Sequence, residues 1–276
     1  MKIKNLIQQN AKKLKNAGIE SFMLDSQLLL AYVLNVKKQD IILNPNREIP
    51  LKNILAFENL VSRREKREPL QYIIEKCEFF GMEFCVNEHV LTPRPDTETL
   101  VASVLAMADM ENILEIGTGS GVIAVALGKH LPKSRITAID ISNQALDVAK
   151  HNAEKNGVAN ITFLQGDIFN FTLSQNYDII ISNPPYVESK KCALLQPEVS
   201  EYEPRLALDG GSDGLDFYRQ IAEIVRNSKL NSHPYIALEI GENQTKAIEK
   251  IFDNHNFALE NAYKDLSGTT RVLMFK

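Results

Sequence analysis

From Asp96 onward, short apolar runs alternate with segments of helical periodicity, and this alternation constrains the fold more than any other feature. The runs fall at 112–116, 135–140, 161–165, 177–182, 235–240, 257–264 and 270–275. Strands that alternate with helices form a parallel sheet with right-handed crossovers. The last two runs are joined through Leu266-Ser267-Gly268, which predicts a hairpin. The sequence therefore predicts an α/β domain of the doubly wound type with seven strands.

A glycine-rich turn joins the first of these strands to the helix that follows it. The strand 112–116 leads into Gly117-Thr118-Gly119-Ser120-Gly121, and an apolar helix begins at Val122. Such a turn lets a ligand approach the backbone closely, and the helix N-terminus offers free N–H groups. The spacing G-x-G-x-G differs from the dinucleotide fingerprint, and no Lys-Ser or Lys-Thr follows as in a P-loop. The turn is either a cofactor loop of another kind or a simple glycine-rich connection.

Acidic residues stand at the ends of three successive predicted strands. Glu115 precedes the glycine loop, Asp140 ends the next strand, and Asp167 follows the third. The carboxyl ends of parallel strands meet at one edge, where open α/β sheets bind their ligands. An acid in the position of Asp140 holds ribose hydroxyls in nucleotide-binding units. Taken alone, Asp140 is better explained as a solvated carboxylate.

The fourth predicted strand ends in Asn183-Pro184-Pro185-Tyr186. Each proline removes a backbone N–H and fixes φ near −65°, and the residue before it is kept out of the α region. The chain therefore leaves the strand stiff and extended, with carbonyl oxygens that no local N–H engages. Asn183 adds a side-chain acceptor and Tyr186 adds an aromatic wall. Two fixed acceptors beside a flat wall suit a planar –NH2 group, and the alternative is a proline-rich turn that only closes the strand.

Together, Glu115 to Gly121, Asp140, Asp167 and Asn183 to Tyr186 resemble the S-adenosylmethionine-dependent methyltransferases that modify planar nitrogen. Residues 91–98, Leu-Thr-Pro-Arg-Pro-Asp-Thr-Glu, are similar to the P-R-P-[DE]-T-E signature of the protein-(glutamine-N5) methyltransferases, which act on peptide chain release factors. Further segments similar to that family are 68–73, 78–81, 203–208 and 210–215. The likeness runs from about Pro69 to the C-terminus, whereas the residues before it match mainly in helical character.

The resemblance implies a Rossmann-like methyltransferase fold and an enzyme that transfers methyl from S-adenosyl-L-methionine to a glutamine side-chain amide in the Gly-Gly-Gln motif of a release factor. The catalytic residues that it implies are Asn183, Pro184, Pro185 and Tyr186. The implied cofactor-binding residues are Glu115, Gly117, Thr118, Gly119, Ser120, Gly121, Asp140, Asp167, Ile168 and Asn183. Glu115 stands where many members have Asp, and Ile168 stands where some place an aromatic. We expect both departures to be tolerated.

The main alternative is a nucleic-acid methyltransferase that acts on adenine N6 or cytosine N4, because an exocyclic base amine presents the same two N–H groups. Such an enzyme must hold DNA or RNA and reach an extruded base. The net charge is −4, and the basic stretch at 63–67 stands alone, whereas duplex DNA binders usually show a basic surface. We therefore expect a protein substrate and no direct nucleic-acid substrate. A non-catalytic cofactor-binding scaffold is disfavoured, since it has no need of an amine clamp.

Composition points to a cytoplasmic protein. The three cysteines, Cys77, Cys85 and Cys192, form no C-x-x-C pair and are typical of reduced thiols. No run of about eighteen apolar residues predicts a membrane span, and the start of the chain lacks a secretory h-region. None of the five histidines falls at the carboxyl end of a predicted strand, so no metal site is predicted.

The predicted domains are an N-terminal helical substrate-recognition domain at 1–75, a β-hairpin linker at 76–95 and the methyltransferase domain at 96–276. Residues 25–34 predict a helix that is apolar nearly all round and therefore central in a bundle. The basic cluster 63–67 is either a solvated helix C-terminus or a contact to an acidic partner protein or RNA. In the first helix, apolar residues recur at helical spacing: Ile3, Leu6, Ile7, Ala11 and Leu14.

Two arginines have two possible roles each. Arg94, between two prolines, lies either beside substrate or cofactor or in a tie to a carboxylate such as Glu98 that fixes the linker. Arg205 either orders the segment after Tyr186 as a lid or forms a structural ion pair.

Overall fold

The computed structural model describes residues 1–107, 110–173, 175–228 and 233–276, and these form two compact units. The helical unit comprises Met1–Glu75 together with Gln196–Tyr202, and the α/β unit comprises Lys76–Leu195 and Glu203–Lys276. The chain therefore passes from the helical unit into the α/β unit at Lys76, returns to the helical unit for Gln196–Tyr202, and re-enters the α/β unit at Glu203. The sequence had not indicated this return, because we expected residues 96–276 to form one continuous domain.

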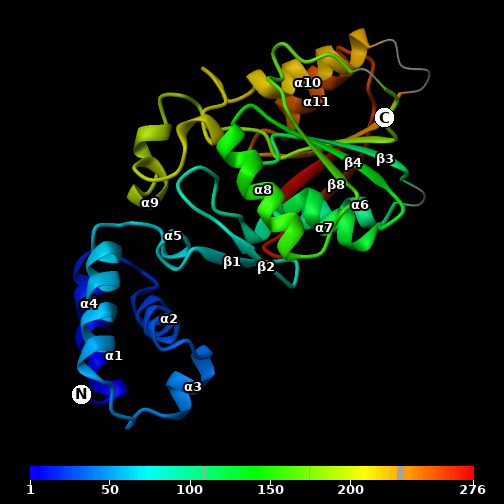
Figure 1. Ribbon diagram of the computed structural model, residues 1–276. Coiled ribbons are helices and arrows are strands. Elements are labelled where there is room, and N and C mark those ends of the chain that lie inside the picture. Colours follow the sequence, from blue (N-terminus) through cyan, green and yellow to red (C-terminus); the bar gives the residue numbers. More distant parts are fainter. Residues whose placement is uncertain (108–109, 174, 229–232) are drawn as a thin grey trace. The chain divides into compact units, whose positions relative to one another are not determined.

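The helical unit is built from α-helices of unequal length (Figure 1). They are α1 Ile3–Asn16, α2 Phe22–Leu34, α3 Lys38–Leu43, α4 Leu51–Glu65, α5 Leu70–Ile74 and, from later in the chain, α9 Pro197–Ser200. The stripe predicted for the first helix is confirmed, because every one of its residues is buried. Most of them share one apolar core with Leu29 and Leu30 of α2 and with Phe57 and Val61 of α4.

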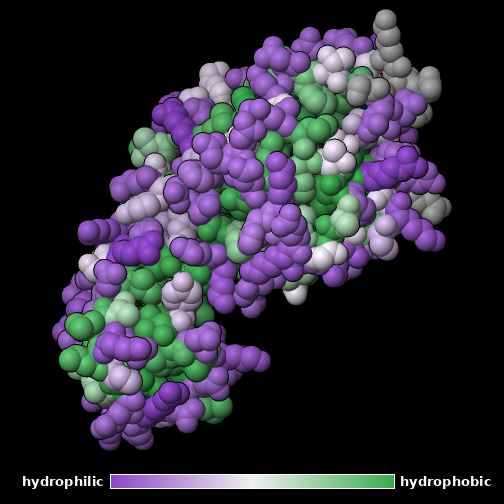
Figure 2. Space-filling model, in the orientation of Figure 1, coloured by the Kyte–Doolittle hydropathy of each residue, from purple (hydrophilic) through white to green (hydrophobic). Residues whose placement is uncertain are grey.

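Helix α2 is central in the bundle, as predicted, since it contacts α1, α3, α4 and α5, but it is not covered on all sides. Leu29 and Leu30 are fully buried, but Met23, Leu24 and Tyr32 are 41–43% exposed. A small bundle surrounds a helix on part of its circumference only, so an all-apolar helix leaves one side uncovered. Figure 2 accordingly shows hydrophobic side chains at the surface of the helical unit.

The α/β unit is organised around a seven-stranded sheet in the order β5-β4-β3-β6-β7-β9-β8. Its strands are β3 Asn112–Ile116, β4 Arg135–Asp140, β5 Ile161–Gln165, β6 Ile179–Ser182, β7 Tyr235–Glu239, β8 Leu259–Lys264 and β9 Thr270–Phe275. Strands β3 to β7 pair in parallel, and β9 is antiparallel to both of its neighbours. The predicted strands and closing hairpin are confirmed, with β6, β7 and β8 each one or two residues shorter than predicted.

Helices cover both faces of this sheet (Figure 1). Helices α6 Glu98–Leu105, α7 Val122–His130 and α8 Asn143–Lys155 pack on one face, and α10 Asp216–Asn227 and α11 Thr245–Asp253 pack on the other. Successive residues of a strand point to opposite faces, so Ile113 joins the first apolar core and Leu114 the second. Because both faces are buried, the central strands read as continuous apolar runs.

The predicted hairpin lies at the start of the α/β unit, as β1 Lys76–Phe79 and β2 Met82–Cys85. Gly81 forms its turn with a φ of 73°, a conformation that glycine adopts readily. Cys77 is opposite Phe84, and Cys85 is opposite Lys76. The two cysteines therefore point to opposite faces of the hairpin, and both are free thiols. No described helix has the length and apolar character needed to cross a membrane.

Candidate active site

A cavity of about 330 Å³ lies at the carboxyl ends of β3, β4 and β6, within the size range of small-ligand sites. Its walls include most of the site residues predicted from the sequence: Gly117, Thr118, Gly119, Ser120, Asp140, Asp167, Ile168, Asn183, Pro184 and Pro185. The other three predicted site residues, Glu115, Gly121 and Tyr186, are not among the described residues that line the cavity. The fold thus brings both predicted loops to one cavity, and three of the predicted residues lie behind its surface.

The glycine loop is shaped by backbone conformations that only glycine adopts readily. Gly117, Gly119 and Gly121 have φ of 74°, 54° and 80°. The backbone N–H groups of Gly117 and Thr118 donate to the carbonyl oxygen of Ile139 at 2.8 and 3.0 Å. A Cβ atom added at Gly117 or Gly119 would meet nothing within 4 Å. The loop therefore presents bare backbone to open space.

Glu115 and Gly121 support this loop from behind. The Oε2 atom of Glu115 accepts hydrogen bonds from Thr118 Oγ1 at 2.7 Å and from the backbone N–H of Ala124 at 3.1 Å. Burial raises the pKa of Glu115 to about 8, and its Oε1 has no hydrogen-bond partner among the described residues. A Cβ at Gly121 would lie 2.9 Å from the Cβ of Ala149 in α8. The third glycine therefore permits close helix packing.

Asp140 is tied into the loop by both of its carboxylate oxygens. Its Oδ2 accepts from the backbone N–H of Gly119 at 2.8 Å, and its Oδ1 accepts from that of Ser142 at 2.9 Å. Burial raises the pKa of Asp140, although these hydrogen bonds partly offset the rise. This placement is at odds with a solvated surface carboxylate. Each oxygen keeps acceptor capacity for a ligand hydroxyl.

Asp167 and Ile168 form another part of the wall. The Oδ1 of Asp167 accepts from the backbone N–H of Phe169 at 3.0 Å, and its Oδ2 accepts from Asn170 Nδ2 at 2.8 Å. Ile168 is buried, whereas the neighbouring Phe169 lines the cavity with 49% of its surface exposed. Phe169 meets Phe217 edge to face, with ring centroids 5.2 Å apart. Aromatic surface is thus present beside the aliphatic residue at 168.

Asn183 is held by residues that lie far from it in the sequence. Its Nδ2 donates to Thr97 Oγ1 at 3.3 Å, and Thr97 ends the 3-10 helix η1 Pro95–Thr97. The buried carboxylate of Glu239, at the end of β7, lies beside both side chains. Two acceptors on one side turn the –NH2 end of the Asn183 amide toward them. The amide oxygen is then left for a donor in the cavity.

Glu239 is a site residue that our sequence reasoning missed. It is 2% exposed, and its Oε2 lacks a hydrogen-bond partner among the described residues. Burial raises its pKa to about 7, with hydrogen bonds from Thr97 and Asn183 and the charge of Arg271 opposing that rise and Asp96 adding to it. The signal that could have found it was present, because Glu239 is the second-last residue of a predicted strand, as Glu115 is, and Asp140 ends another.

Three glycines and one glutamine brace the Asn-Pro-Pro-Tyr segment from outside. A Cβ at Gly214 would lie 2.3 Å from the carbonyl oxygen of Tyr186, one at Gly210 would lie 2.8 Å from its Cα, and one at Gly241 would lie 2.9 Å from its Cδ2. The Nε2 of Gln244 donates to the same carbonyl oxygen at 3.0 Å. The glycines near 210–214 are therefore required by close packing against Tyr186.

The ring of Tyr186 does not form the aromatic wall that we predicted. It packs against the apolar core beneath α10 and α11, and burial raises the pKa of its phenol. Within the described walls of the cavity, the aromatic side chains are Phe169, Phe217 and the imidazole of His89. The contribution of Tyr186 is therefore to anchor the segment, not to line the site.

Arg94 fits parts of both predicted roles. It lines the cavity, and its Nη2 also forms an ion pair with Glu203 Oε2 at 2.6 Å. The predicted partner was wrong, because Glu98 accepts a hydrogen bond from the backbone N–H of Phe80 instead. Arg94 therefore ties the linker to the segment that begins at Glu203.

Arg205 lies in a local ion pair, whereas His89 lies in the wall of the cavity. Arg205 forms an ion pair with Asp209 at 3.0 Å, which supports the structural interpretation. Its side chain is otherwise 69% exposed. His89 lines the cavity although it ends no strand. Across the described residues, no cluster of three or more His, Cys, Asp or Glu could hold a metal ion.

The basic cluster at 63–67 is largely paired within the helical unit, so it is not a solvated helix C-terminus. Arg63 pairs with Glu68 at 2.5 Å. Arg64 is buried, and Arg64 and Arg67 both form ion pairs with carboxylates of the same unit. Lys66 alone in this cluster has an exposed side chain without an ion pair among the described residues. The missed signal was a carboxylate more than 130 residues away.

Comparison with known proteins places the chain in a family. Residues 5–74 match the family model of the PrmC N-terminal domain, and residues 94–215 match that of the methyltransferase small domain. The release factor glutamine methyltransferase of Geobacter sulfurreducens is 39% identical over 98% of this chain and 95% of its own length; that of Fusobacterium nucleatum is 38% identical over 99% and 78%. A methyltransferase crystal structure from Pyrococcus furiosus, at 20% identity, has a TM-score of 0.54 over 71% of this chain and 89% of its own, which shows the fold. The chain belongs to the release factor glutamine methyltransferase family.

Proposed function

We propose that this protein transfers a methyl group from S-adenosyl-L-methionine to the side-chain amide nitrogen of a glutamine in a peptide chain release factor. The observation that carries the proposal is that the glycine loop and Asn183-Pro184-Pro185 line the same cavity. One loop suits a nucleoside cofactor, and the other suits a planar –NH2 group. Relatives that match nearly the whole chain are named for this reaction.

The residues at the glycine loop fit the cofactor. Gly117 and Gly119 present backbone to open space, and Glu115 keeps one buried oxygen without a partner among the described residues. We propose that the loop backbone holds the amino-acid end, that Asp140 accepts from the ribose hydroxyls, and that Asp167 and Ile168 border the base. When bound, S-adenosylmethionine supplies a methyl group that its sulfonium makes electrophilic.

An amide nitrogen is a weak nucleophile, because its lone pair is delocalised into its carbonyl. The segment from Asn183 to Tyr186, called the acceptor loop below, would compensate for this weakness. Asn183 Oδ1 and the backbone carbonyl of Pro184 would each accept one N–H of the glutamine amide. Such orientation can contribute several kcal/mol to the rate, and the same oxygens stabilise positive charge that grows on nitrogen. As the nitrogen gains the methyl carbon, the carbon–sulfur bond of the sulfonium would break and leave a neutral thioether, and the nitrogen then loses one of its two protons to solvent. No base is needed beforehand, because the nitrogen becomes acidic only as it is methylated.

We propose that the helical unit recognises the release factor and that the chain acts in the cytoplasm, where such a partner is found. Residues 1–75 would form the recognition domain, 76–95 the linker and 96–276 the methyltransferase domain. A single glutamine side chain offers little surface for specificity, and a free peptide loses ordering entropy on binding. A folded release factor would present its glutamine already positioned. The apolar side chains exposed on the helical unit are compatible with this role.

Labelled methyl transfer tests the function. The full chain is incubated with labelled S-adenosylmethionine and, in separate reactions, a folded release factor, duplex DNA and RNA. The expected result is label in the release factor only, mapped by mass spectrometry to one glutamine side chain. Label on adenine N6 or cytosine N4 would establish the alternative, and absence of label from the release factor would refute the proposal.

A further inference from the structure

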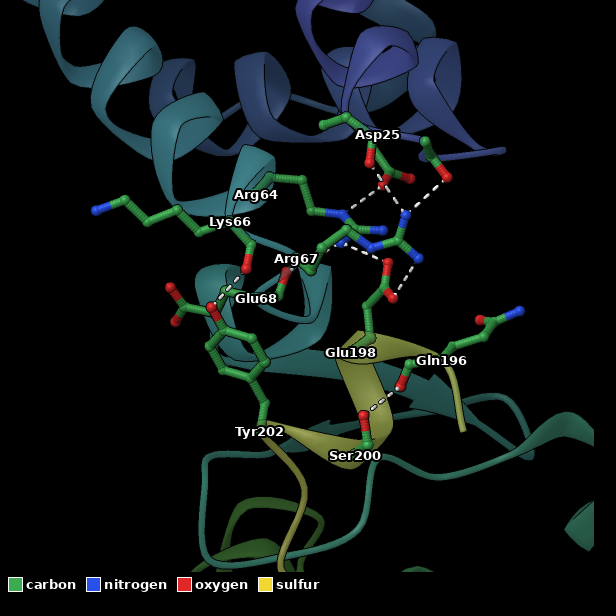
Figure 3. A network of polar contacts seen from close by, with 11 residues as sticks. Asp25, Arg64, Lys66, Arg67, Glu68, Gln196, Glu198, Ser200 and Tyr202 are labelled. Atoms are coloured by element: carbon green, nitrogen blue, oxygen red, sulfur yellow. Dashed lines mark hydrogen bonds and ion pairs between the residues drawn. The ribbon is translucent and has the colours of Figure 1, made fainter. Parts of the chain in front are cut away.

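A short segment that follows the acceptor loop belongs to the helical unit. The chain leaves Tyr186, passes the 3-10 helix η2 Cys192–Leu194, and reaches α9 Pro197–Ser200, which groups with the N-terminal helices. Figure 3 shows α9 facing the C-terminal end of α4, with Glu198 directed at Arg64 and Arg67. A four-residue helix such as α9 is not stable alone, so contacts with other residues must hold it in place.

Glu198 makes the central contact. Its Oε1 accepts from Arg64 Nη1 at 2.9 Å, and its Oε2 accepts from Arg67 Nη2 at 2.5 Å. Arg64 also donates through Nε to Asp25 Oδ2 at 2.8 Å. The side chains of Arg64 and Asp25 are only 7% and 3% exposed. The hydroxyl of Tyr202 adds a hydrogen bond to the backbone carbonyl of Lys66 at 2.6 Å.

Charge balance shows why Glu198 in particular matters. The group contains two guanidinium ions, the buried one of Arg64 and the partly exposed one of Arg67, and among the described residues of α1 to α5 only the carboxylate of Asp25 pairs with them directly. Glu198 supplies the second carboxylate. Burial opposes its ionisation, but its own backbone N–H and the two arginines lower its pKa overall. A buried ion pair adds little net stability, but removal of one partner is strongly destabilising because it leaves the other charge uncompensated.

The segment held in this way continues directly into the cavity wall. Glu203, which follows Tyr202, pairs with Arg94 of the cavity. Pro204, Leu206 and Ala207 then line the cavity themselves. The two ends of the stretch from 187 to 210 are joined by backbone hydrogen bonds. The N–H of Val187 donates to the carbonyl of Leu208 at 3.0 Å, and the N–H of Gly210 donates to the carbonyl of Val187 at 2.8 Å. The stretch 203–207 is therefore bounded on one side by this closure and on the other by the segment at Glu198.

We propose that Glu198 is a positioning residue for methyl transfer: by fixing residues 196–202 on the helical unit, it restrains the stretch 203–207 that lines the acceptor cavity. The helical unit then contributes to the reaction through the chain, in addition to any role in partner recognition. This inference rests on the proposed function. It also gives Arg64 and Arg67 a role inside the enzyme, whereas the sequence had suggested either a solvated helix C-terminus or a contact to a partner.

The test compares Glu198→Gln with Glu201→Gln in the full chain. Both changes remove one negative charge from the same segment, but the side chain of Glu201 is exposed. For Glu198→Gln we expect amide hydrogen exchange in 196–202 to accelerate about tenfold or more. Single-turnover transfer to a release factor should fall about ten- to a hundredfold, while cofactor affinity measured by calorimetry stays within a factor of about two. Glu201→Gln should match wild type in all three measurements.

A transfer rate for Glu198→Gln equal to that of Glu201→Gln would overturn the proposal. So would a fall in rate that only mirrors loss of folded protein or of cofactor affinity. If Glu198→Gln fails to fold, Tyr202→Phe decides, because it removes only the hydroxyl bonded to Lys66 and should produce a smaller change in the same direction. Wild-type enzyme assayed in parallel separates the two hypotheses: without wild-type transfer the proposed function fails, and with it only the positioning role is at stake.

Discussion

The two loops that line the cavity follow neighbouring strands, β3 and β6, yet they are held in different ways. The glycine loop is fixed by residues close to it in the sequence, namely Glu115, Ile139 and Asp140, through backbone hydrogen bonds and positive φ angles. The Asn-Pro-Pro-Tyr segment is braced in part by residues much further away in the sequence, 58 positions for Gln244 and 86 for Thr97. The residues that contact or closely approach this segment are Thr97, Gly210, Gly214, Glu239, Gly241 and Gln244.

This difference teaches which parts of a site depend on remote packing. The glycine loop keeps its shape wherever β3, α7 and the neighbouring strand β4 form together. An acceptor loop with distant supports forms only when the linker, the segment after Tyr186 and β7 are all in place. We therefore expect damage to the first loop to appear in cofactor affinity, and damage to the second in the rate of transfer.

The largest effect should follow Asn183→Ala. The change removes one of the two proposed acceptors of the glutamine amide and leaves the glycine loop intact. Single-turnover transfer to a release factor should fall by about a hundredfold or more, with a much smaller change in cofactor affinity. A variant that transfers methyl at nearly the wild-type rate would show that the amide clamp is wrong.

The same contrast explains what the sequence could and could not predict. Strand positions, the glycine loop and the Asn-Pro-Pro-Tyr segment rest on local patterns, and all were found at or within two residues of their predicted places. Glu239 was missed although it ends a strand, because its relation to Asn183 exists only after β6 and β7 pair. The pairing of Glu198 with Arg64 and Arg67 joins residues more than 130 positions apart. No periodicity or short motif encodes such a contact.

Asp140→Asn should weaken cofactor binding, in contrast to Asn183→Ala, which should mainly slow transfer. Replacing one carboxylate oxygen by an –NH2 group removes acceptors for the ribose hydroxyls and disturbs the tie to Gly119. Affinity for S-adenosylmethionine should weaken by roughly 1.5–3 kcal/mol, about ten- to a hundredfold. Asp147→Asn is the control, because the side chain of Asp147 is 77% exposed. Equal cofactor affinities by calorimetry for both variants would remove Asp140 from the cofactor site.

Gly214→Ala tests the distant bracing of the acceptor loop against Gly157→Ala. Both glycines have left-handed φ, 76° and 66°, so both changes add a similar backbone strain of about 1–2 kcal/mol. A Cβ at position 157 meets nothing within 4 Å, whereas one at 214 would press on the carbonyl oxygen of Tyr186. Transfer should therefore be about tenfold slower in Gly214→Ala than in Gly157→Ala. Equal rates would mean that the segment tolerates displacement.

The smallest effect concerns Glu239 and pH. Its pKa in the folded protein is raised by burial to about 7 from the usual 4.5, so the folded state holds this proton more tightly than the unfolded state. The stability that this proton contributes is complete below pH 4.5 and is lost as pH rises through 7. Glu239→Gln lacks this loss, so its melting temperature relative to wild type should rise by a few degrees between pH 5 and pH 8.

The control for this measurement is Glu242→Gln, because Glu242 is exposed in the turn after β7. Its melting temperature relative to wild type should not change with pH. The charged and titratable groups nearest Glu239 are Asp96, Arg271, Tyr186 and Tyr218, and they are the same in both variants. A pH-independent difference for Glu239→Gln would show that the carboxylate ionises as an exposed one does.

The central claim is that one loop holds the cofactor and the other holds the acceptor amide. A crystal structure of the full chain with S-adenosylhomocysteine and a release factor tests it most directly. We predict that the glutamine amide nitrogen lies within hydrogen-bond distance, about 2.7–3.2 Å, of both Asn183 Oδ1 and the Pro184 carbonyl oxygen, with the ribose hydroxyls on Asp140. An amide nitrogen bound by other groups and more than about 4 Å from Asn183 would contradict the account.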